Sequence, residues 1–355
     1  MSTTFDAVVI GMGQAGPSLA ARLCAHGMKV AIVERDQFGG TCVNNGCTPT
    51  KAMVASAYAA HLATRAAQYG VVLPGSPTVS MKRVKSRTEE IVRNAREGVE
   101  SWMAGLKSAT IYRGQARFSG PRSVEVSGEV LTADKIFINV GGRPLIPRMP
   151  GLDAVPYLTS VSMMDLDFVP EHLLVIGGSY VGLEFAQIFR RFGSRVTVVE
   201  MGPRLVGHED EDVSRCIEDF LSGEGIALRL GAQCVSMHSA VDGLSVGLDC
   251  KEGAPREAGS HVLLAVAARQ IQTTSVWARR RSRLTRTVTS RWTKGFSRQI
   301  HTSGLSVTAT AKAPSRIRHI TITRLLPTTC SQARRANTLI GHRFMLSLRT
   351  RRWDE

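Results

Sequence analysis

Two cysteines five residues apart, Cys42 and Cys47, are the side chains of this sequence best suited to redox chemistry. They lie in a glycine-bracketed turn at residues 39–51, GGTCVNNGCTPTK, which runs into an alanine-rich stretch of helical pattern. A thiolate close to a helix N-terminus has a lowered pKa and reacts faster with disulfides. The spacing therefore predicts a dithiol that exchanges electrons with a disulfide.

The remaining cysteines and the amino-terminal residues bear on the compartment. The start of the sequence carries Asp6 and no basic run, which argues against a signal peptide. No apolar run approaches the roughly eighteen residues that a membrane span needs, so we expect no membrane association. A reducing, cytoplasmic setting follows, in which paired thiols are more often catalytic than structural. The cysteines expected to be buried and inert are Cys24, Cys216, Cys234 and Cys250.

A glycine-rich turn just upstream of the dithiol predicts a dinucleotide-binding site. Gly11, Gly13 and Gly16 follow an apolar strand and open a helix. Such glycines provide a tight turn, close backbone approach to a pyrophosphate and close packing of helix on strand. The pyrophosphate then lies at the helix N-terminus, where free N–H groups favour negative charge. The next strand ends on Glu34, which is placed to accept hydrogen bonds from ribose hydroxyls, and this context argues against a ligand-free glycine turn.

The same pattern recurs in the second half of the chain. An apolar strand at 173–176 leads into a turn that contains Gly177, Ser179 and Gly182, and the following strand ends on Glu200. Ser179 replaces the middle glycine but is small enough to permit close backbone approach. The repeated strand–turn–helix pattern predicts an α/β protein with two Rossmann-like dinucleotide-binding domains.

The dithiol segment and the turn before it resemble the FAD-dependent pyridine nucleotide–disulfide oxidoreductases. The string TCVNNGC is most similar to mercuric reductases, and next to dihydrolipoamide dehydrogenases. The resemblance implies that Cys42 is the interchange thiol that meets the substrate. It implies that Cys47 is the flavin-side thiol, in charge-transfer contact with the isoalloxazine ring. Lys51 matches the lysine near flavin N5, paired with a glutamate of the second nucleotide domain, here Glu184.

The resemblance also implies two cofactors, FAD in the first unit and NADH or NADPH in the second. Tyr180 matches a residue that covers the flavin where nicotinamide enters, and residues 114–116 match the segment that contacts adenine. Glu200 would repel a 2′-phosphate, which favours NADH over NADPH. The expected cofactor-binding residues are Gly11, Gly13, Gly16, Glu34, Gly40, Thr41, Lys51, Gly114, Ala116, Gly141, Gly142, Arg143, Gly177, Ser179, Tyr180, Gly182 and Glu200.

The implied activity is an electron relay from NAD(P)H through FAD to the Cys42–Cys47 disulfide, and then to a small disulfide or a metal ion of the mercuric type. In such enzymes the protein supplies placement and electrostatics, while the redox chemistry belongs to the flavin. No protein-bound metal is expected, because the acidic run at 208–212 resembles a solvated surface. Proline-rich connections near residue 150 mark a boundary. The predicted domains are therefore an FAD-binding domain at 1–150 and an NAD(P)-binding domain at 151–266.

The composition changes abruptly after Val266. Residues 1–266 carry 26 Lys and Arg against 27 Asp and Glu, whereas residues 267–355 carry 19 against 2. The net charge of +16 therefore resides in the last quarter of the chain. Arginine supplies 17 of the 19 basic residues there, and no hydrophobic period of helix or strand persists. We expect a basic tail at 267–355 that is disordered or non-native and forms no native domain.

A shifted reading frame accounts for this tail. Taking the third base of each codon with the first two of the next, residues 306–332 permit the string GDCNGKGAFTHTSYNDYEIVADNLLAG. Residues 266–277 permit GRTPNTDDLGL at the same offset. Both strings resemble the family's continuation, including the GD motif whose aspartate holds the flavin's ribityl chain. We infer that the frame slipped close to the Val266 codon.

Two functions from different classes remain open at this point. The first is the flavin-dependent oxidoreductase, impaired because the interface domain with which the family forms homodimers is missing as amino acids. The second is a non-catalytic dinucleotide-binding remnant whose arginine-rich tail adheres to polyanions through charge, without specific recognition of nucleic acid.

Overall fold

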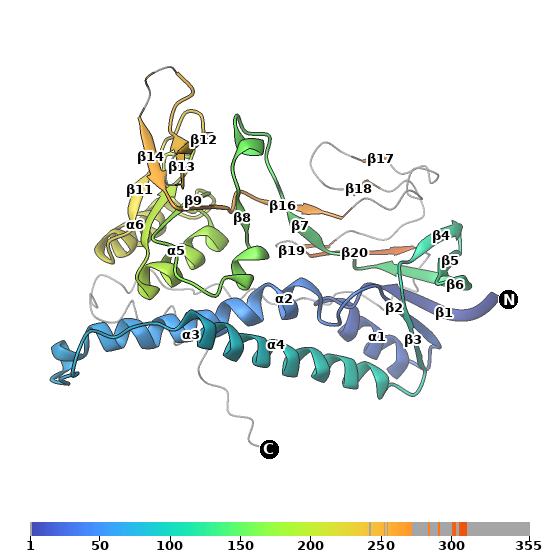
Figure 1. The fold of residues 1–355 in the computed structure, drawn as a ribbon. Coiled ribbons are helices and arrows are strands. Elements are labelled where there is room, and N and C mark those ends of the chain that lie inside the picture. Colours follow the sequence, from blue (N-terminus) through green and yellow to red (C-terminus); the bar gives the residue numbers. More distant parts are fainter. Residues whose placement is uncertain are drawn as a thin grey trace.

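The computed structural model describes residues 2–240, 243–251, 253 and 255–271, and short strands at 283–284, 290–291, 300–302 and 305–310. Over these residues the chain has the predicted α/β fold, with two parallel sheets of Rossmann type (Figure 1). None of the helices in this part of the chain is both long enough and apolar enough to cross a membrane.

The first sheet is organised around the central strand β1, whose last four residues are apolar and which pairs in parallel with strands on both sides. The four residues Ala7, Val8, Val9 and Ile10 are buried, because α1 (Gly16–Ala25) covers one face and a β-meander covers the other. The strands of this sheet before residue 150 are β1 (Ser2–Ile10), β2 (Val30–Glu34), β3 (Ala109–Arg113), β4 (Arg117–Gly120), β5 (Ser123–Val126) and β6 (Glu129–Ile138).

The second sheet repeats this plan with β9 at its centre, in the order β11-β10-β9-β15-β8. Helices α5 (Tyr180–Phe192) and α6 (Glu211–Gly223) accompany it, and an antiparallel three-stranded meander, β12-β13-β14, lies beside it. The strands are β8 (Leu158–Thr159), β9 (His172–Ile176), β10 (Arg195–Val199), β11 (Ala227–Arg229), β12 (Ser236–Ala240), β13 (Gly243–Gly247), β14 (Arg256–Gly259) and β15 (His261–Leu264).

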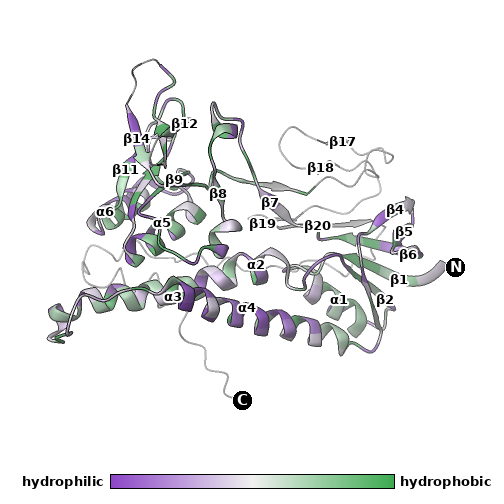
Figure 2. Cartoon of the chain, viewed as in Figure 1, coloured by the Kyte–Doolittle hydropathy of each residue, from purple (hydrophilic) through white to green (hydrophobic). Residues whose placement is uncertain are grey.

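Two long helices run beneath both sheets in Figure 1, α3 (Cys47–Thr64) and α4 (Met81–Ala104). Helix α4 is mostly hydrophilic and exposed, and only Met81, Thr88 and Met103 are buried (Figure 2). Short α2 (Gly40–Asn44) precedes α3, and single turns of 3-10 helix occur at Ala66–Tyr69, Leu152–Ala154 and Ser162–Asp165.

Among the described strands after Val266, one hairpin extends the first sheet and the others form separate two-stranded sheets. β16 (Ala268–Gln270) pairs with β7 (Gly142–Pro144), and β20 (Leu305–Thr310), paired with β19 (Ile300–Thr302), lies antiparallel to β6. A two-residue ladder joins β17 (Arg283–Leu284) to β18 (Ser290–Arg291). Most of the predicted non-native tail, residues 267–355, lies outside the described residues, and the predicted domain limits remain a prediction.

The expectation that Cys24, Cys216, Cys234 and Cys250 are buried is wrong, because Cys250 is exposed and the other three are of intermediate exposure. Cys234 and Cys250 form a disulfide, and Cys250 is exposed. The pairing was not accessible from sequence, because connectivity between distant cysteines depends on the fold. Cys24 and Cys216 are not disulfide-bonded and are of intermediate exposure.

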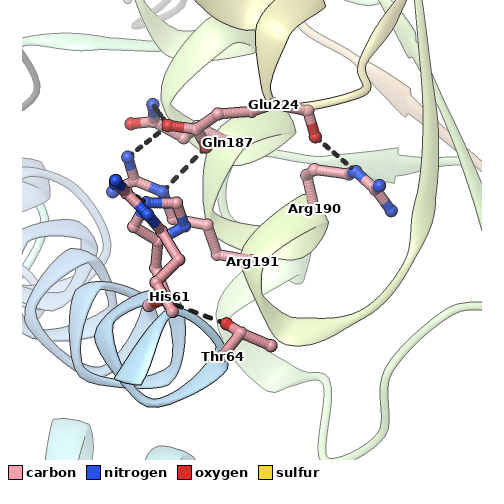
Figure 3. A network of polar contacts seen from close by, with 7 residues as sticks. His61, Thr64, Gln187, Arg190, Arg191 and Glu224 are labelled. Atoms are coloured by element: carbon pink, nitrogen blue, oxygen red, sulfur yellow. Dashed lines mark hydrogen bonds and ion pairs between the residues drawn. The ribbon is translucent and has the colours of Figure 1, made fainter. Parts of the chain in front are cut away.

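A buried ion pair of the second unit lies beside α3 of the first. The Arg191 guanidinium of α5 donates two hydrogen bonds to the Glu224 carboxylate, of 2.9 and 2.5 Å, and Gln187 donates a third of 3.2 Å (Figure 3). The guanidinium also lies 6.0 Å from the Tyr58 ring of α3. Burial, reinforced by the charge of Arg191, lowers the pKa of His61 on the same helix. His61 is therefore neutral at neutral pH and adds no positive charge to the cluster.

Replacing Arg191 should destabilise the fold more than replacing an exposed arginine. The side chains of Arg191 and Glu224 are 4% and 11% exposed, so Arg191→Ala leaves a buried carboxylate without its counter-ion. We expect a loss of about 3–5 kcal/mol in the free energy of unfolding, measured by urea denaturation. The matched control is Arg122→Ala, whose pair with Asp134 is 75% and 70% exposed and should cost less than about 1 kcal/mol. Equal losses in the two variants would contradict this assignment.

Candidate functional site

The two glycine-rich turns have the same backbone construction. The Gly11 N–H donates to the Val33 carbonyl at 2.7 Å, and the Gly177 N–H donates to the Val199 carbonyl at 2.9 Å. Both glycines have positive φ, of 95° and 113°, which favours glycine over any residue with a side chain. A Cβ on the third glycine of either turn, Gly16 or Gly182, would lie 2.2 Å from the carbonyl oxygen of the first. These glycines are thus required by packing before any ligand is considered.

An acid at the end of the second strand holds each turn closed. The Glu34 carboxylate accepts backbone hydrogen bonds from Met12, at 2.7 Å, and from Asp36, at 2.9 Å. The Glu200 carboxylate accepts the equivalent bonds from Gly178, at 2.6 Å, and from Gly202, at 2.7 Å. A carboxylate oxygen has room for more than one donor, so both acids can still accept a ribose hydroxyl.

The dithiol segment packs directly on the first turn. A Cβ on Gly40 would lie 2.7 Å from the Cα of Gly13, and the Gly39 N–H donates to the Met12 carbonyl at 2.8 Å. Gly39 and Gly40 both have positive φ, which lets the chain bend onto the turn. Helix α2 then carries Cys42, and α3 begins at Cys47. The disulfide chemistry is therefore placed beside the dinucleotide turn by two adjacent glycines.

The two thiols differ in their acidity. A hydrogen bond from Cys42, reinforced by the positive charge of Lys51, lowers the pKa of Cys47 to about 6, although burial opposes the shift. The same hydrogen bond and burial raise the pKa of Cys42 far above its ordinary value. Because Cys47 is the first residue of α3, the helix dipole also favours its thiolate. In the reduced pair the proton lies on Cys42 and the negative charge on Cys47.

One side-chain ion pair connects the dithiol segment to the second unit. Lys51 lies one helical turn after Cys47, and its ammonium forms an ion pair with Glu184 of α5. On the same helix, the Tyr180 hydroxyl donates to Glu209. The Lys51 and Glu184 side chains are 42% and 30% exposed, so their pairing contributes little stability. Its consequence is electrostatic, because it brings opposite charges close to Cys47.

A single cavity of about 1070 Å³ joins these features. It extends from the first glycine turn past the dithiol to the start of α5, so residues more than a hundred positions apart share its wall. The site residues predicted from the sequence that line this cavity are Gly11, Gly13, Glu34, Gly40, Thr41, Cys42, Cys47, Lys51, Gly114, Ala116, Gly141, Gly142, Arg143, Ser179, Tyr180 and Glu184. The predicted residues that do not line it are Gly16, Gly177, Gly182 and Glu200.

Three asparagines that were not predicted from the sequence as site residues also line this cavity. The side-chain oxygens of Asn44 and Asn45, and both amide atoms of Asn139, are buried without a hydrogen-bond partner in the described structure. Buried polar atoms normally form hydrogen bonds, so these atoms are available to a polar ligand that binds in the cavity. The expected FAD fits, because it offers many hydroxyl, carbonyl and phosphate groups. Asn139 could have been identified, since ligands bind at the carboxyl ends of parallel strands, where it follows β6.

Comparisons with known proteins show the family to which the chain belongs. The sequence profile of the family described as "Pyridine nucleotide-disulphide oxidoreductase" matches residues 5–274. A mercuric reductase of Streptomyces lividans is 34% identical over 274 residues, covering 76% of this chain and 58% of that protein. A dihydrolipoyl dehydrogenase of Thermus scotoductus is 35% identical over 255 residues, covering 72% and 54%.

Among solved structures, the Cu(II) complex of the HOCl-induced flavoprotein disulfide reductase RclA from Escherichia coli is similar, with a TM-score of 0.65 and 30% identity. The match covers 75% of this chain and 57% of that one. The chain thus spans a little over half the length of the relatives it matches.

The thiolate of Cys47 should persist to unusually low pH. In the reduced protein, its alkylation rate should fall as the pH drops through about 6, whereas an ordinary cysteine loses its thiolate near pH 9.0. Removing the hydrogen-bond donor with Cys42→Ala, or the nearby charge with Lys51→Met, should move this midpoint upward. Lys107→Met, outside the cavity, is the matched control and should leave it unchanged. A midpoint near that of an ordinary thiol in the unaltered chain would contradict the assigned charge state.

Proposed function

Because the chain belongs to the pyridine nucleotide-disulphide oxidoreductase family, we propose that it is a flavoprotein that passes electrons from NAD(P)H through FAD to the Cys42–Cys47 pair. The family uses FAD and NAD(P)H. The final acceptor is a small disulfide or a metal ion of the mercuric type. The observation that carries the proposal is the shared cavity, in which the first glycine turn, the dithiol and the start of α5 meet.

Bound FAD would supply the two-electron transfer between nicotinamide and the dithiol. In this proposal the first glycine turn and the three asparagines without hydrogen-bond partners bind and orient the cofactor. Lys51 and the N-terminus of α3 then hold Cys47 as a thiolate. The thiol of Cys42 retains its proton until a substrate is present. The reduced pair thus contains a nucleophilic thiolate at Cys47 and a protonated thiol at Cys42.

The second unit is proposed to bind the nicotinamide cofactor and to prefer NADH. Supporting this preference, the Glu200 carboxylate accepts a hydrogen bond from the second glycine turn, and its charge there would repel a 2′-phosphate. Tyr180 and Val181 are 51% and 45% exposed at the start of α5, so they stand where an entering nicotinamide would pass.

Turnover is proposed to be impaired in this chain. No histidine occurs among the residues described as lining the cavity, so no imidazole is at hand to take the Cys42 proton. The sequence after Val266, where the family's homodimer interface is expected, departs from the family pattern. A small amount of flavin reduction with little substrate turnover is the expected behaviour.

The purified full-length chain should be yellow, and NADH should bleach its flavin faster than NADPH does. Cys42→Ser should leave this flavin reduction in place while abolishing the small residual reduction of a disulfide or of Hg(II) that the unaltered chain retains. Absorbance of the flavin and of the nicotinamide measures both steps. A colourless protein that binds nucleic acid in a salt-sensitive manner would overturn the proposal in favour of a non-catalytic remnant.

A single methyl group at the glycine turn should separate cofactor binding from folding. A Cβ on Gly13 meets nothing within 4 Å, and Gly13 lines the cavity, so Gly13→Ala should fold normally but obstruct the cofactor. We expect a tenfold or larger fall in FAD affinity, about 1.4 kcal/mol or more, by flavin fluorescence titration. Gly16→Ala is the contrasting variant and should destabilise the fold itself, because its Cβ would clash with the Gly11 carbonyl. Unchanged FAD affinity in Gly13→Ala would contradict this placement.

A further inference from the structure

A second cysteine pair lies apart from the cavity. Cys234 and Cys250 are joined as a disulfide, with their Cα atoms 5.3 Å apart and a separation of 16 positions in sequence. Neither residue lines the cavity that contains Cys42 and Cys47. Cys250 is exposed, and the neighbouring side chains of Asp249 and Lys251 form an ion pair at 3.3 Å. The bond is therefore open to thiols and oxidants in solution.

The disulfide closes the open end of a β-hairpin. Strands β12 and β13 pair from Ala240 opposite Gly243 to Ser236 opposite Gly247. Cys234 lies just before the first of these strands, and Cys250 lies just after the second. One end of the hairpin is closed by its chain connection and the other by sulfur. The cross-link thus keeps the two strands together where no further ladder hydrogen bonds do so.

This hairpin holds the segment that connects the two units. The Met237 N–H donates to the Pro150 carbonyl at 2.8 Å, and the Ser239 hydroxyl donates to the Ala154 carbonyl at 3.1 Å. The contact is so close that a Cβ on Gly151 would lie 1.9 Å from the Met237 carbonyl oxygen. Leu152 and Met237 are buried in the same apolar cluster. Loosening the hairpin would therefore loosen the connection between the two sheets.

We propose that Cys234 and Cys250 form a reversible redox staple that stabilises this connection and responds to small-molecule disulfides. In the oxidising direction, the Cys250 thiolate attacks one sulfur of a small disulfide and releases one thiol. Cys234 then attacks the mixed disulfide, releases the second thiol and completes the internal bond, and the two cysteine protons pass to the released thiolates. A small dithiol reverses both steps. The staple operates without flavin or nicotinamide, so it does not depend on the proposed function.

The two cysteine pairs can be followed separately in one experiment. Trypsin cleaves at Arg and Lys, so each pair lies in its own peptide, residues 230–251 for the staple and 36–51 for the dithiol. The full-length chain is equilibrated in glutathione buffers of graded ratio, quenched in acid, alkylated and analysed by mass spectrometry. We expect peptide 230–251 to convert as a unit between a doubly alkylated form and an unalkylated form that is lighter by two hydrogen atoms than the dithiol. Persistence of the dithiol in every buffer, or cross-links only between chains, would overturn the proposal.

Thermal unfolding tests whether the bond acts as a staple. The oxidised full-length chain should unfold on the order of 5 °C above the reduced chain. This difference should vanish in Cys234→Ser/Cys250→Ser and persist in Cys42→Ser/Cys47→Ser and in the Cys24→Ser control. An internal disulfide that forms without any thermal shift would overturn the stabilising role. Because the unaltered chain carries the main comparison, the test stands even if the staple variant folds poorly.

Discussion

The contact between Gly40 and Gly13 is the constraint on which the site depends. At this point the dithiol segment touches the dinucleotide turn backbone to backbone, and the approach leaves no space for a methyl group on Gly40. A side chain at Gly40 would push α2 away from the turn and carry Cys42 with it. The redox pair and the cofactor site are consequently one structural unit, built from a run of about forty residues near the start of the chain.

The packing of α3 on α5 extends this unit to the second half of the protein. Met53 and Ala57 of α3 share an apolar cluster with Phe185 and Phe189 of α5. Two further contacts join these helices: the Lys51–Glu184 ion pair beside the dithiol, and the Arg191 guanidinium over the Tyr58 ring. The apolar area supplies most of the stability, whereas the polar contacts define which residues face each other. The electrostatic environment of Cys47 is therefore determined jointly by both units.

The cavity shows how a binding site is left incomplete by the protein alone. Glu34 and Glu200 accept hydrogen bonds from the backbone of their own glycine turns, so the turns are already formed before any ligand binds. Asn139, by contrast, has no partner for its amide in the described structure. Preformed turns reduce the entropic cost of binding, and unpaired amides provide a favourable enthalpy for a ligand that can satisfy them.

The sequence by itself determined the local elements and the chemistry they carry. The apolar strands, the glycine turns and the terminal acids Glu34 and Glu200 were predicted correctly, because each depends on residues close together in the chain. Cys42 and Cys47 were identifiable for the same reason. Only the tertiary structure decided the charge state of Cys47, the burial of Arg191 against Glu224, and the bond between Cys234 and Cys250. These properties depend on distances between segments remote in sequence, and on burial, which no local pattern of residue types specifies.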